Sequence, residues 1–392
     1  HISKNSMGTG IVDFNNDELA DIVSLDMLPE SNYRQKLLKG PDEYDTYQLL
    51  VDSGFYHQNT RNMLQINQGI SDKGIPVFSE VGQMAGISNT DWSWSPLAGD
   101  FDNDGRKDLL VTNGFLRDFT NMDFLKYTYQ EEVNKAQNAG QQLNTWQLIQ
   151  QMSQTLVSNY GFSNQGNGQD ISFKNVTESW GLSTPSISTG AAYADLDNDG
   201  DLDLVINNSN QPALVYENRE QQQSPSHYLR IQLSQNQSNT YGVGAKIVLH
   251  TASGVQTQTL FPAQCFQSCS EPIVHFGLGK DSLISALEVY WTDGKVTKLS
   301  AIKTNQLLKI NNQNAVEGVF SLPENPAMFD DFTDKSGLNF THQNLLQVDF
   351  KQQILLPYQL SRLGPFMADG DVNGDWLEDA IVGGNYLNPA VL

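Results

Sequence analysis

Four segments of the chain share one pattern of polar and apolar positions. In each, acidic or amide side chains alternate over nine residues and give way to a run of mostly apolar residues. Short apolar runs bounded by turn-forming residues predict buried β-strands, so each segment predicts an acidic loop that leads into a strand. The four segments are "DFNNDELADIVSL" from Asp13, "DFDNDGRKDLLVTN" from Asp100, "DLDNDGDLDLVINN" from Asp195 and "DVNGDWLEDAIVGG" from Asp371.

A second phrase, F-x-x-[VF]-x-x-x-x-G-[IL], precedes three of the four acidic loops and begins at Phe78, Phe173 and Phe329. A third phrase stands earlier, in "NMLQINQG" from Asn62 and "LVYENRE" from Leu214. Together they form a repeated cassette of three or four short antiparallel strands, which is typical of a β-propeller blade. We therefore predict an all-β chain of propeller blades in which the acidic loops connect the blades.

Two long segments interrupt the repeats and predict helical insertions. Residues 27–58 are polar and partly helical in pattern. Residues 118–160 contain apolar residues at helical spacing, namely Trp146, Ile149, Met152 and Leu156. Insertions between strands usually lie on one face of a propeller, where binding surfaces form.

A stretch without an acidic loop predicts a separate domain. Residues 227–311 contain at least six strand-like runs between turn residues, as in a small β-sandwich. We assign residues 1–225 to propeller blades, 226–312 to the β-sandwich-like domain, 313–327 to a linker and 328–392 to the start of a further propeller. Because the chain opens and closes within repeats and begins with His1, we expect it to be a piece of a longer protein.

Charge and hydropathy exclude several classes of partner. The 392 residues include 23 Lys and Arg against 45 Asp and Glu, a formal net charge of -22. This charge disfavours nucleic acid and anionic lipid as main partners, because both are negatively charged. No apolar run approaches the ~20 residues of a membrane span. Bound cations would offset part of the negative charge.

The acidic loops have the composition of a site for a hard cation. Aspartate stands at positions 1, 5 and 9 of each loop, and aspartate or asparagine at position 3. Calcium takes about six to eight oxygen ligands from carboxylates, backbone carbonyls and water. No histidine or cysteine is present in the loops to favour zinc or copper. The predicted Ca²⁺ ligands are Asp13, Asn15, Asp17, Asp21, Asp100, Asp102, Asp104, Asp108, Asp195, Asp197, Asp199, Asp203, Asp371, Asn373, Asp375 and Asp379.

The loops differ in how closely they follow the pattern. Those from Asp100 and Asp195 have glycine at position 6, whereas Glu18 and Trp376 take that position in the other two, which we expect to bind calcium more weakly. An EF-hand begins in the same way but needs a glutamate at position 12 and flanking helices. Here position 12 lies inside predicted strands, so we reject the EF-hand. At position 7, we expect Asp201 to offer its backbone carbonyl rather than its carboxylate. We expect the ions to stabilise the fold rather than to act as a switch.

These repeats resemble the FG-GAP/VCBS repeats of integrin α-subunit propellers and of many bacterial surface proteins. The segment that contains "HFGLG" (275–279) and "V-x-W-x-D-G" (289–294) resembles an ASPIC/UnbV domain. "MLPESNYRQKLLKGPDEYDTYQLL" and "NTDWSWSPLAGDFDNDGRKDLLVTNG" further resemble a group of Bacteroidota VCBS-repeat proteins. Members of that group are generally exported lipoproteins, often encoded beside outer-membrane nutrient-uptake systems of the SusC/SusD type. The resemblance implies calcium-binding propellers at the cell surface and no established enzymatic activity.

The chain departs from this family at Cys265 and Cys269, where members tend to have glycine and serine. A small disulfide in an exported protein and two free buried thiols are both open alternatives.

Enzyme signatures are absent from the sequence, since no H-E-x-x-H, G-x-S-x-G or G-x-x-x-x-G-K-[ST] occurs. We predict that His275 ends a strand as a hydrogen-bonded structural residue. Trp92 and Trp94 lie two residues apart and so on the same face of a strand or turn. Four further aromatic residues cluster in the first insertion: Tyr44, Tyr47, Phe55 and Tyr56. Such aromatics fit either the blade core or a platform on which a sugar or peptide stacks.

We therefore predict a non-enzymatic, calcium-stabilised binding module on the extracellular face of the outer membrane. The expected role is that of an accessory lipoprotein in a nutrient-uptake complex, with a transporter complex as protein partner and a glycan or peptide as ligand. No nucleic acid partner is expected. One alternative is a glycan-active hydrolase or lyase on a propeller scaffold, and another is a purely adhesive or structural module.

Overall fold

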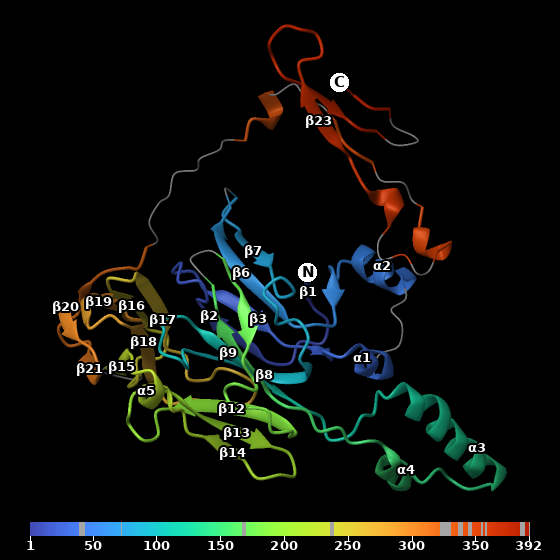
Figure 1. Cartoon of the computed structure of the whole chain (residues 1–392), viewed down its shortest axis with the longest axis horizontal. Coiled ribbons are helices and arrows are strands. Elements are labelled where there is room, and N and C mark those ends of the chain that lie inside the picture. Colours follow the sequence, from blue (N-terminus) through green and yellow to red (C-terminus); the bar gives the residue numbers. More distant parts are fainter. Residues whose placement is uncertain are drawn as a thin grey trace. The chain divides into compact units, whose positions relative to one another are not determined.

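The computed structural model describes residues 1–38, 44–71, 73–166, 170–235, 239–321, 331–335, 340–343, 347–353, 356, 359–384 and 389–391. The chain divides into two compact units. Unit 1 comprises His1–Asp42 and Leu49–Leu322, and unit 2 comprises Glu43–Gln48 and Pro323–Leu392. Unit 1 is built mainly from β-strands (Figure 1), whereas the described part of unit 2 contains one short hairpin and short helical segments.

Three sheets of unit 1 have the strand order of propeller blades (Figure 1). Blade 1 consists of β2 (Thr9–Val12), β3 (Asp21–Ser24), β6 (Met63–Ile70) and β7 (Pro76–Glu80). Blade 2 consists of β8 (Asp91–Gly99), β9 (Asp108–Asn113), β10 (Tyr160–Asn164) and β11 (Phe173–Asn175), with β4 (Met27–Leu28) beside β8. Blade 3 consists of β12 (Ser188–Ala194), β13 (Asp203–Asn208) and β14 (Leu214–Tyr216). Consecutive strands of each blade pair antiparallel.

The acidic loops join the first two strands within a blade, β2 to β3, β8 to β9 and β12 to β13. The prediction that they connect one blade to the next is therefore wrong. The apolar run after each loop is the second strand, which pairs back onto the first, so each loop is the turn of a hairpin.

The core of the propeller part lies in the seams between blades. Strand β9 is buried along its whole length because its two faces pack into different seams. Leu109 and Val111 belong to the cluster shared with blade 1, and Leu110 to the cluster shared with blade 3. The second sequence phrase ends in these same seams, where Ile87 and Leu182 are buried. The two hydrophobic clusters thus hold three blades side by side.

The predicted separate β domain is a two-sheet sandwich. One sheet has the order β18-β15-β21 and the other β17-β16-β19-β20-β22, and a single hydrophobic cluster lies between them. Its strands are β15 (His227–Ser234), β16 (Lys246–His250), β17 (Val255–Thr259), β18 (Ile273–Gly279), β19 (Leu283–Tyr290), β20 (Lys295–Lys303), β21 (Gln306–Asn311) and β22 (Val316–Glu317). All six predicted strand-like runs form strands of this sandwich.

Both insertions contain helices, as predicted. The first holds α1 (Asn32–Leu38) and α2 (Tyr44–Asp52), and the second holds the π-helix η1 (Phe124–Tyr129), α3 (Gln130–Asn138) and α4 (Thr145–Gln151). Helix α4 is shorter than the apolar spacing predicts, because Met152 has an extended backbone and ends it. Among the described residues, no helix combines the length and the apolar character that spanning a membrane requires. The remaining elements of unit 1 are α5 (Glu220–Gln223) and the parallel pair β1 (Ile2–Ser3) and β5 (Gln58–Asn59).

Unit 2 contains the fourth acidic loop in the hairpin of β23 (Met367–Gly370) and β24 (Asp379–Val382). The other regular elements among its described residues are the first part of α2 and short 3-10 helices at Thr333–Lys335, Asp349–Lys351 and Leu360–Arg362. Residues 322–330 and 336–339, which include part of the predicted linker and both ends of the phrase that begins at Phe329, lie outside the described residues. The predicted domain boundaries stay predictions, whereas the predicted fold class, propeller blades with helical insertions plus a small sandwich, is confirmed.

Candidate metal centres

All four acidic loops have the same backbone conformation at two positions. Positions 4 and 6 lie in the left-handed region, which asparagine and glycine adopt more easily than other residues. At position 4 the φ angles are 57° for Asn16, 54° for Asn103, 64° for Asn198 and 78° for Gly374. At position 6 they are 71° for Glu18, 94° for Gly105, 98° for Gly200 and 68° for Trp376. The shifted glycine of the fourth loop therefore meets the requirement of position 4, while position 6 accepts a strained non-glycine residue in two loops.

The aspartate at position 9 closes each loop. One carboxylate oxygen accepts a hydrogen bond from the backbone N–H of position 2, over 2.9 Å in Asp21, 2.9 Å in Asp108, 2.8 Å in Asp203 and 3.0 Å in Asp379. In the three loops of unit 1, the other carboxylate oxygen accepts a backbone N–H from the third strand of the blade or from just after that strand. The donors are Asn67, Asn164 and Asn218. This residue therefore fixes the loop to its own sheet, whatever else it binds.

Asn67, Asn164 and Asn218 form a second repeated set that the sequence analysis missed. Each side-chain amide donates to the position-8 carbonyl of the loop in its own blade, at Ala20, Lys107 and Leu202. Two of them also donate to the preceding loop, Asn164 to the Phe14 carbonyl over 2.9 Å and Asn218 to the Phe101 carbonyl over 2.7 Å. The signal was available, because Asn67 and Asn218 occupy the same place in the third sequence phrase.

Direct bonds also connect the loops of successive blades. The Asn16 side chain donates to the carbonyl of Gly105 over 3.0 Å, and the Asn103 side chain donates to the carbonyl of Gly200 over 3.0 Å. Both donors stand at position 4 and both acceptors at position 6 of the next loop. Three acidic loops therefore lie in an unbroken row.

The structure brings the predicted ligands together in two compact groups among the described residues. Ligand atoms of Asp100, Asp102 and Asp104 lie within 4.8 Å of one another, and so do those of Asp195, Asp197 and Asp203. These are the two loops with the full sequence pattern. Position 12 of all four loops lies in a strand, at Ser24, Val111, Ile206 and Val382. Flanking helices are absent from these hairpins, so the rejection of an EF-hand is confirmed.

Several of the predicted ligand oxygens are buried without a hydrogen-bond partner. They belong to position 3 in Asn15 and Asp102, to position 1 in Asp195 and to position 5 in Asp199. A buried acceptor that is left unpaired costs about 1–3 kcal/mol. A hard cation coordinated by these oxygens would remove that cost, and their chemistry fits calcium.

Burial of these carboxylates changes their acidity. Loss of solvent raises the pKa of Asp100 to about 7 and that of Asp21 to about 7. The pKa of Asp13 is raised to about 6 by the same cause, against hydrogen bonds from Thr257 and the loop backbone that lower it. In the exposed fourth loop the pKa of Asp371 is instead lowered, by the backbone N–H of Trp376 first. A bound cation would favour the ionised form in the three buried loops.

Basic side chains lie beside these loops, Arg230 from the sandwich domain and Arg106 and Lys107 from the second loop itself. Arg230 Nη1 donates to Asp195 Oδ2 over 2.7 Å and leaves Asp195 Oδ1 unpartnered. Lys107 is almost fully buried beside Asp100, and Arg106 pairs with Asp104. The Asp201 carboxylate accepts an N–H from Gln221 over 3.1 Å, so it faces α5, and its backbone carbonyl remains the predicted ligand.

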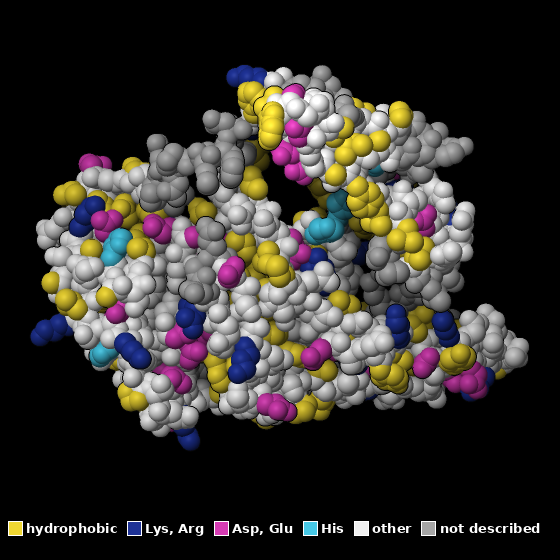
Figure 2. Space-filling model, turned by 45° about the horizontal axis from the view of Figure 1, so that its top comes forward, with side chains coloured by type: hydrophobic (Ala, Val, Ile, Leu, Met, Phe, Trp, Pro, Cys, Tyr) yellow, Lys and Arg dark blue, Asp and Glu magenta, His cyan; other side chains and the backbone are white. Residues whose placement is uncertain are grey.

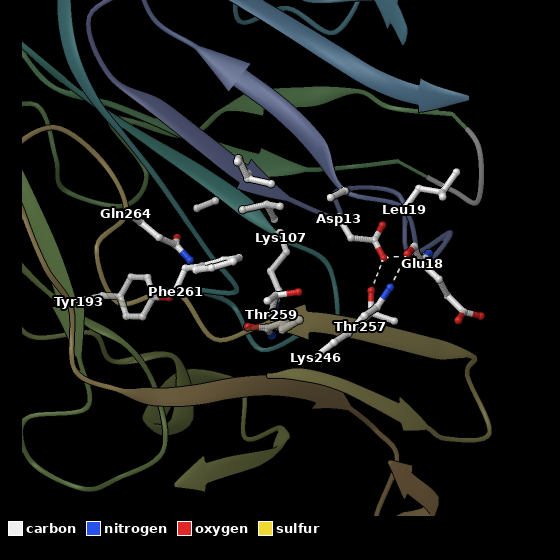
Figure 3. Close-up of a pocket in the computed structure, with 15 residues that line it drawn as sticks. Asp13, Glu18, Leu19, Lys107, Tyr193, Lys246, Thr257, Thr259, Phe261 and Gln264 are labelled. Atoms are coloured by element: carbon white, nitrogen blue, oxygen red, sulfur yellow. Dashed lines mark hydrogen bonds between the residues drawn. The ribbon is translucent and has the colours of Figure 1, made fainter. Parts of the chain in front are cut away.

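Two cavities adjoin the loops. The first, of about 100 Å³, lies between loop 1 and the sandwich and contains Asp13, Lys107, Lys246 and Thr257 (Figure 3). The second, of about 330 Å³, lies between blades 2 and 3 and is lined by Asp102, Trp180 and Tyr216 among others. Only the second reaches the size range of small-molecule sites, roughly 300–1,000 Å³.

The aromatic pair singled out in the sequence packs into a row of rings. The Trp92 ring stacks on Phe115 with centroids 4.5 Å apart, and the Trp94 ring lies 4.7 Å from Phe266 of the sandwich domain. Trp94 Nε1 also donates to the Gly114 carbonyl over 2.7 Å. Both tryptophans are half-buried, which supports packing over a free stacking platform. Of the first-insertion aromatics, Phe55 and Tyr56 are exposed and Tyr44 and Tyr47 half-buried.

The surroundings of His275 indicate a structural role. His275 lies inside β18, not at its end as predicted, and its Nε2 is 2.6 Å from Asn103 Oδ1. Burial lowers its pKa to about 3, so the ring is neutral.

Cys265 and Cys269 are free thiols in the structure, and burial raises the pKa of Cys265 to about 12. A reactive thiolate at Cys265 is therefore disfavoured.

Charged side chains do not gather into one patch on the face shown in Figure 2, where acidic and basic groups are interspersed. Much of the acidic excess is hidden, because most predicted ligands of the first three loops are at least half-buried. Exposed apolar side chains occur on the second helical insertion, at Leu125, Tyr127 and Trp146. The first three acidic loops are thus an internal feature of unit 1.

Comparison with known proteins agrees with this architecture. Residues 235–317 match the family described as ASPIC and UnbV. The chain is similar to cartilage acidic protein 1 of Xenopus tropicalis, with 37% identity over 112 residues, 28% of this chain and 17% of that protein. It is 34% identical over 128 residues to cartilage acidic protein 1 of Mus musculus and of Homo sapiens, covering 31% of this chain and 19% of each relative. The match thus spans less than a fifth of the length of these relatives. This chain joins propeller-type blades to an ASPIC and UnbV domain.

Proposed function

We propose that the chain is a calcium-stabilised, extracellular interaction module without enzymatic activity. The observation that carries the calcium part is the set of buried, unpartnered side-chain oxygens at Asn15, Asp102, Asp195 and Asp199. They stand at ligand positions of loops that share one backbone conformation. Calcium would supply the positively charged partner that these oxygens lack. It would also hold the hairpin turns of the blades in place.

Support for a binding role comes from the fold and from one cavity. The chain combines propeller-type blades with an ASPIC and UnbV domain and is similar to cartilage acidic protein 1, a protein named for cartilage. The cavity of about 330 Å³ presents the rings of Trp180 and Tyr216 beside acidic groups. Ring faces with a few polar groups are typical of sites that bind small ligands or side chains. The proposed ligands are a glycan or a peptide.

The specific cellular role that we propose is that of an accessory lipoprotein of an outer-membrane nutrient-uptake complex. The resemblance to Bacteroidota VCBS-repeat proteins supports this role. The test is fractionation and co-purification of the native full-length protein from its source. We expect it at the cell surface in association with an outer-membrane transporter, and recovery from the cytoplasm alone would contradict the proposal.

Metal analysis tests the calcium part. The purified chain is dialysed against calcium, and bound metal is measured by elemental analysis for the wild type, Asp102→Asn and Glu178→Gln. Glu178 is an exposed residue outside the loops and serves as the control. We expect about two calcium ions for the wild type and for the control, and fewer for Asp102→Asn. A wild type without bound calcium would contradict the proposal.

A further inference from the structure

The sandwich domain touches all three acidic loops of unit 1 at position 1. Thr257 Oγ1 donates to Asp13 Oδ2 over 2.8 Å, as Figure 3 shows. Arg230 Nη1 donates to Asp195 Oδ2 over 2.7 Å. At the middle loop the domain comes still closer, because a Cβ atom on Gly277 would lie 2.2 Å from Asp100 Oδ2. Three different strands of one domain thus reach the same position in three loops.

Position 6 is covered in the same way. Lys246 Nζ donates to the carbonyl of Glu18 over 2.7 Å (Figure 3). A Cβ atom on Gly105 would lie 3.1 Å from Gln256 Nε2, and one on Gly200 would overlap the ring of Tyr228 at 1.9 Å. Each loop therefore receives one residue of the sandwich at position 1 and another at position 6.

The "HFGLG" segment accounts for the middle contact. His275 Nε2 donates to Asn103 Oδ1 over 2.6 Å, and the backbone N–H of Gly279 donates to the Asn103 carbonyl over 2.8 Å. Asn103 stands between the proposed ligands Asp102 and Asp104. Gly277 leaves no room for a side chain against the loop. One of the two phrases that mark the ASPIC/UnbV domain in the sequence, HFGLG, therefore lies on the loop.

We propose that the ASPIC/UnbV domain is a recognition surface for cation-filled acidic loops, so that its docking on the blades and calcium binding strengthen each other. The domain contacts fix the position-1 carboxylate and the left-handed peptide at position 6, and both belong to the conformation that a cation requires. Coupling of this kind is reciprocal, so removal of a domain contact weakens calcium binding. This inference rests on the proposed calcium sites.

Calorimetric calcium titration of the full chain tests it, with Gly277→Ala and Thr257→Val as variants. Gly277→Ala pushes β18 off the middle loop, and Thr257→Val removes one hydrogen bond at nearly constant volume. Val289→Ala is the matched control, because Val289 lies in the sandwich core. We expect calcium affinity to fall about tenfold in Gly277→Ala, within the usual range of coupling between sites. We expect a smaller fall in Thr257→Val and none in Val289→Ala.

Hydrogen exchange provides the second measurement and does not need the variants. Calcium removal from the wild type is expected to increase exchange in β15, β17 and β18, the strands that face the loops, more than in β20. Equal affinities for wild type and both variants, or a fall in Val289→Ala as large as in Gly277→Ala, would overturn the inference. Failure of the proposed calcium sites would show already as no titration signal in the wild type.

Discussion

The acidic loop of blade 2 and the acidic loop of unit 2 share three internal hydrogen bonds but have different surroundings. In both, position 1 accepts N–H groups from positions 5 and 6, and position 9 accepts the N–H of position 2. Asp100 is buried under the sandwich domain, whereas residues 371–378 are exposed. The pKa of Asp100 is accordingly raised, to about 7, and that of Asp371 lowered. The motif thus determines the turn, and the neighbouring domain determines its electrostatics.

Calcium removal is expected to have the largest effect and to distinguish the two loops. A ligand present at a thousand times its Kd stabilises the native state by about 4 kcal/mol per site. Because unit 1 holds two full-pattern loops, EDTA should lower the Tm of the main thermal transition by about 10 °C or more. Scanning calorimetry with calcium, magnesium or EDTA checks this. An unchanged Tm would show that the buried loops need no cation.

Substitution of the position-1 aspartate in each of the two loops should give the next largest difference in stability. The two buried oxygens of Asp100 each accept one backbone N–H, over 3.0 and 2.9 Å, and Asp100→Asn replaces one of them with an NH2 group that cannot accept a hydrogen bond or bind a cation. We expect a loss of about 3 kcal/mol in the free energy of unfolding. Asp371→Asn in the exposed loop should change the melting curve much less. Denaturant unfolding of both variants measures the difference, and equal losses would contradict the role given to burial.

Replacement of one glycine by alanine in a buried loop and in the exposed loop gives a second pair of variants. Gly200→Ala places a Cβ atom 1.9 Å from the Tyr228 ring at a φ of 98°, so strain and overpacking together should cost about 2–3 kcal/mol. Gly374→Ala has a φ of 78° but no atom within 4 Å of the new Cβ, which leaves the backbone cost of about 1 kcal/mol. Urea denaturation of the two variants tests the ranking, and a larger loss in Gly374→Ala would reverse it.

The calcium effect is expected to grow with pH. The folded pKa of Asp100 and of Asp21 is about 7, above the ordinary aspartate value of 3.8. Metal-free folded protein therefore prefers the protonated carboxyl, and its stability from these groups is present below about pH 4 and lost as the pH rises toward 7. Calcium binds the ionised form, so the Tm difference between calcium and EDTA should be larger at pH 8 than at pH 5. A constant difference would exclude these carboxylates as ligands.

The smallest predicted effect concerns position 6 of the first loop. Glu18 has a φ of 71°, and its carbonyl, not its side chain, accepts the bond from Lys246. Glu18→Gly relieves the left-handed strain at the cost of some backbone freedom, for a net gain of about 0.5–1 kcal/mol. It also gives the first loop the position-6 glycine of the stronger loops, while Asn15 stays at position 3. Thermal unfolding in calcium measures the gain, and a loss would show that the Glu18 side chain contributes.

The sequence was sufficient for the parts of the fold that depend on local chemistry. Asparagine or glycine at position 4 and the alternating carboxylates encode the turn, and the apolar run after position 9 encodes the second strand. The sandwich was predicted from the spacing of its strand-like runs. Helix α4 was overestimated because Trp146, at helical spacing, is exposed and only Leu148 of the helix is buried. Helical spacing alone did not show how far the helix extends.

What the sequence did not show depends on residues that are far apart along the chain. The bond from Lys246 to Glu18 spans 228 positions, and that from Thr257 to Asp13 spans 244. No repeat or periodicity marks these pairs, because each lies at a surface between two different folds. The place of His275 against Asn103, 172 positions away, was missed for the same reason. The loops were thus predictable as ligand sets but not as a surface that another domain covers.

The bonds from Asn16 to the Gly105 carbonyl and from Asn103 to the Gly200 carbonyl have a consequence for how such chains grow. The donor is an asparagine side chain that the first three repeats carry at position 4, whereas the acceptor is a peptide group that any amino acid supplies. A duplicated repeat with this asparagine therefore already contains the donor of the hydrogen bond to the next repeat. No matching substitution is needed in that next repeat. Stability in such an array is approximately a sum of repeat and nearest-neighbour terms. Gene duplication could lengthen or shorten the row one blade at a time.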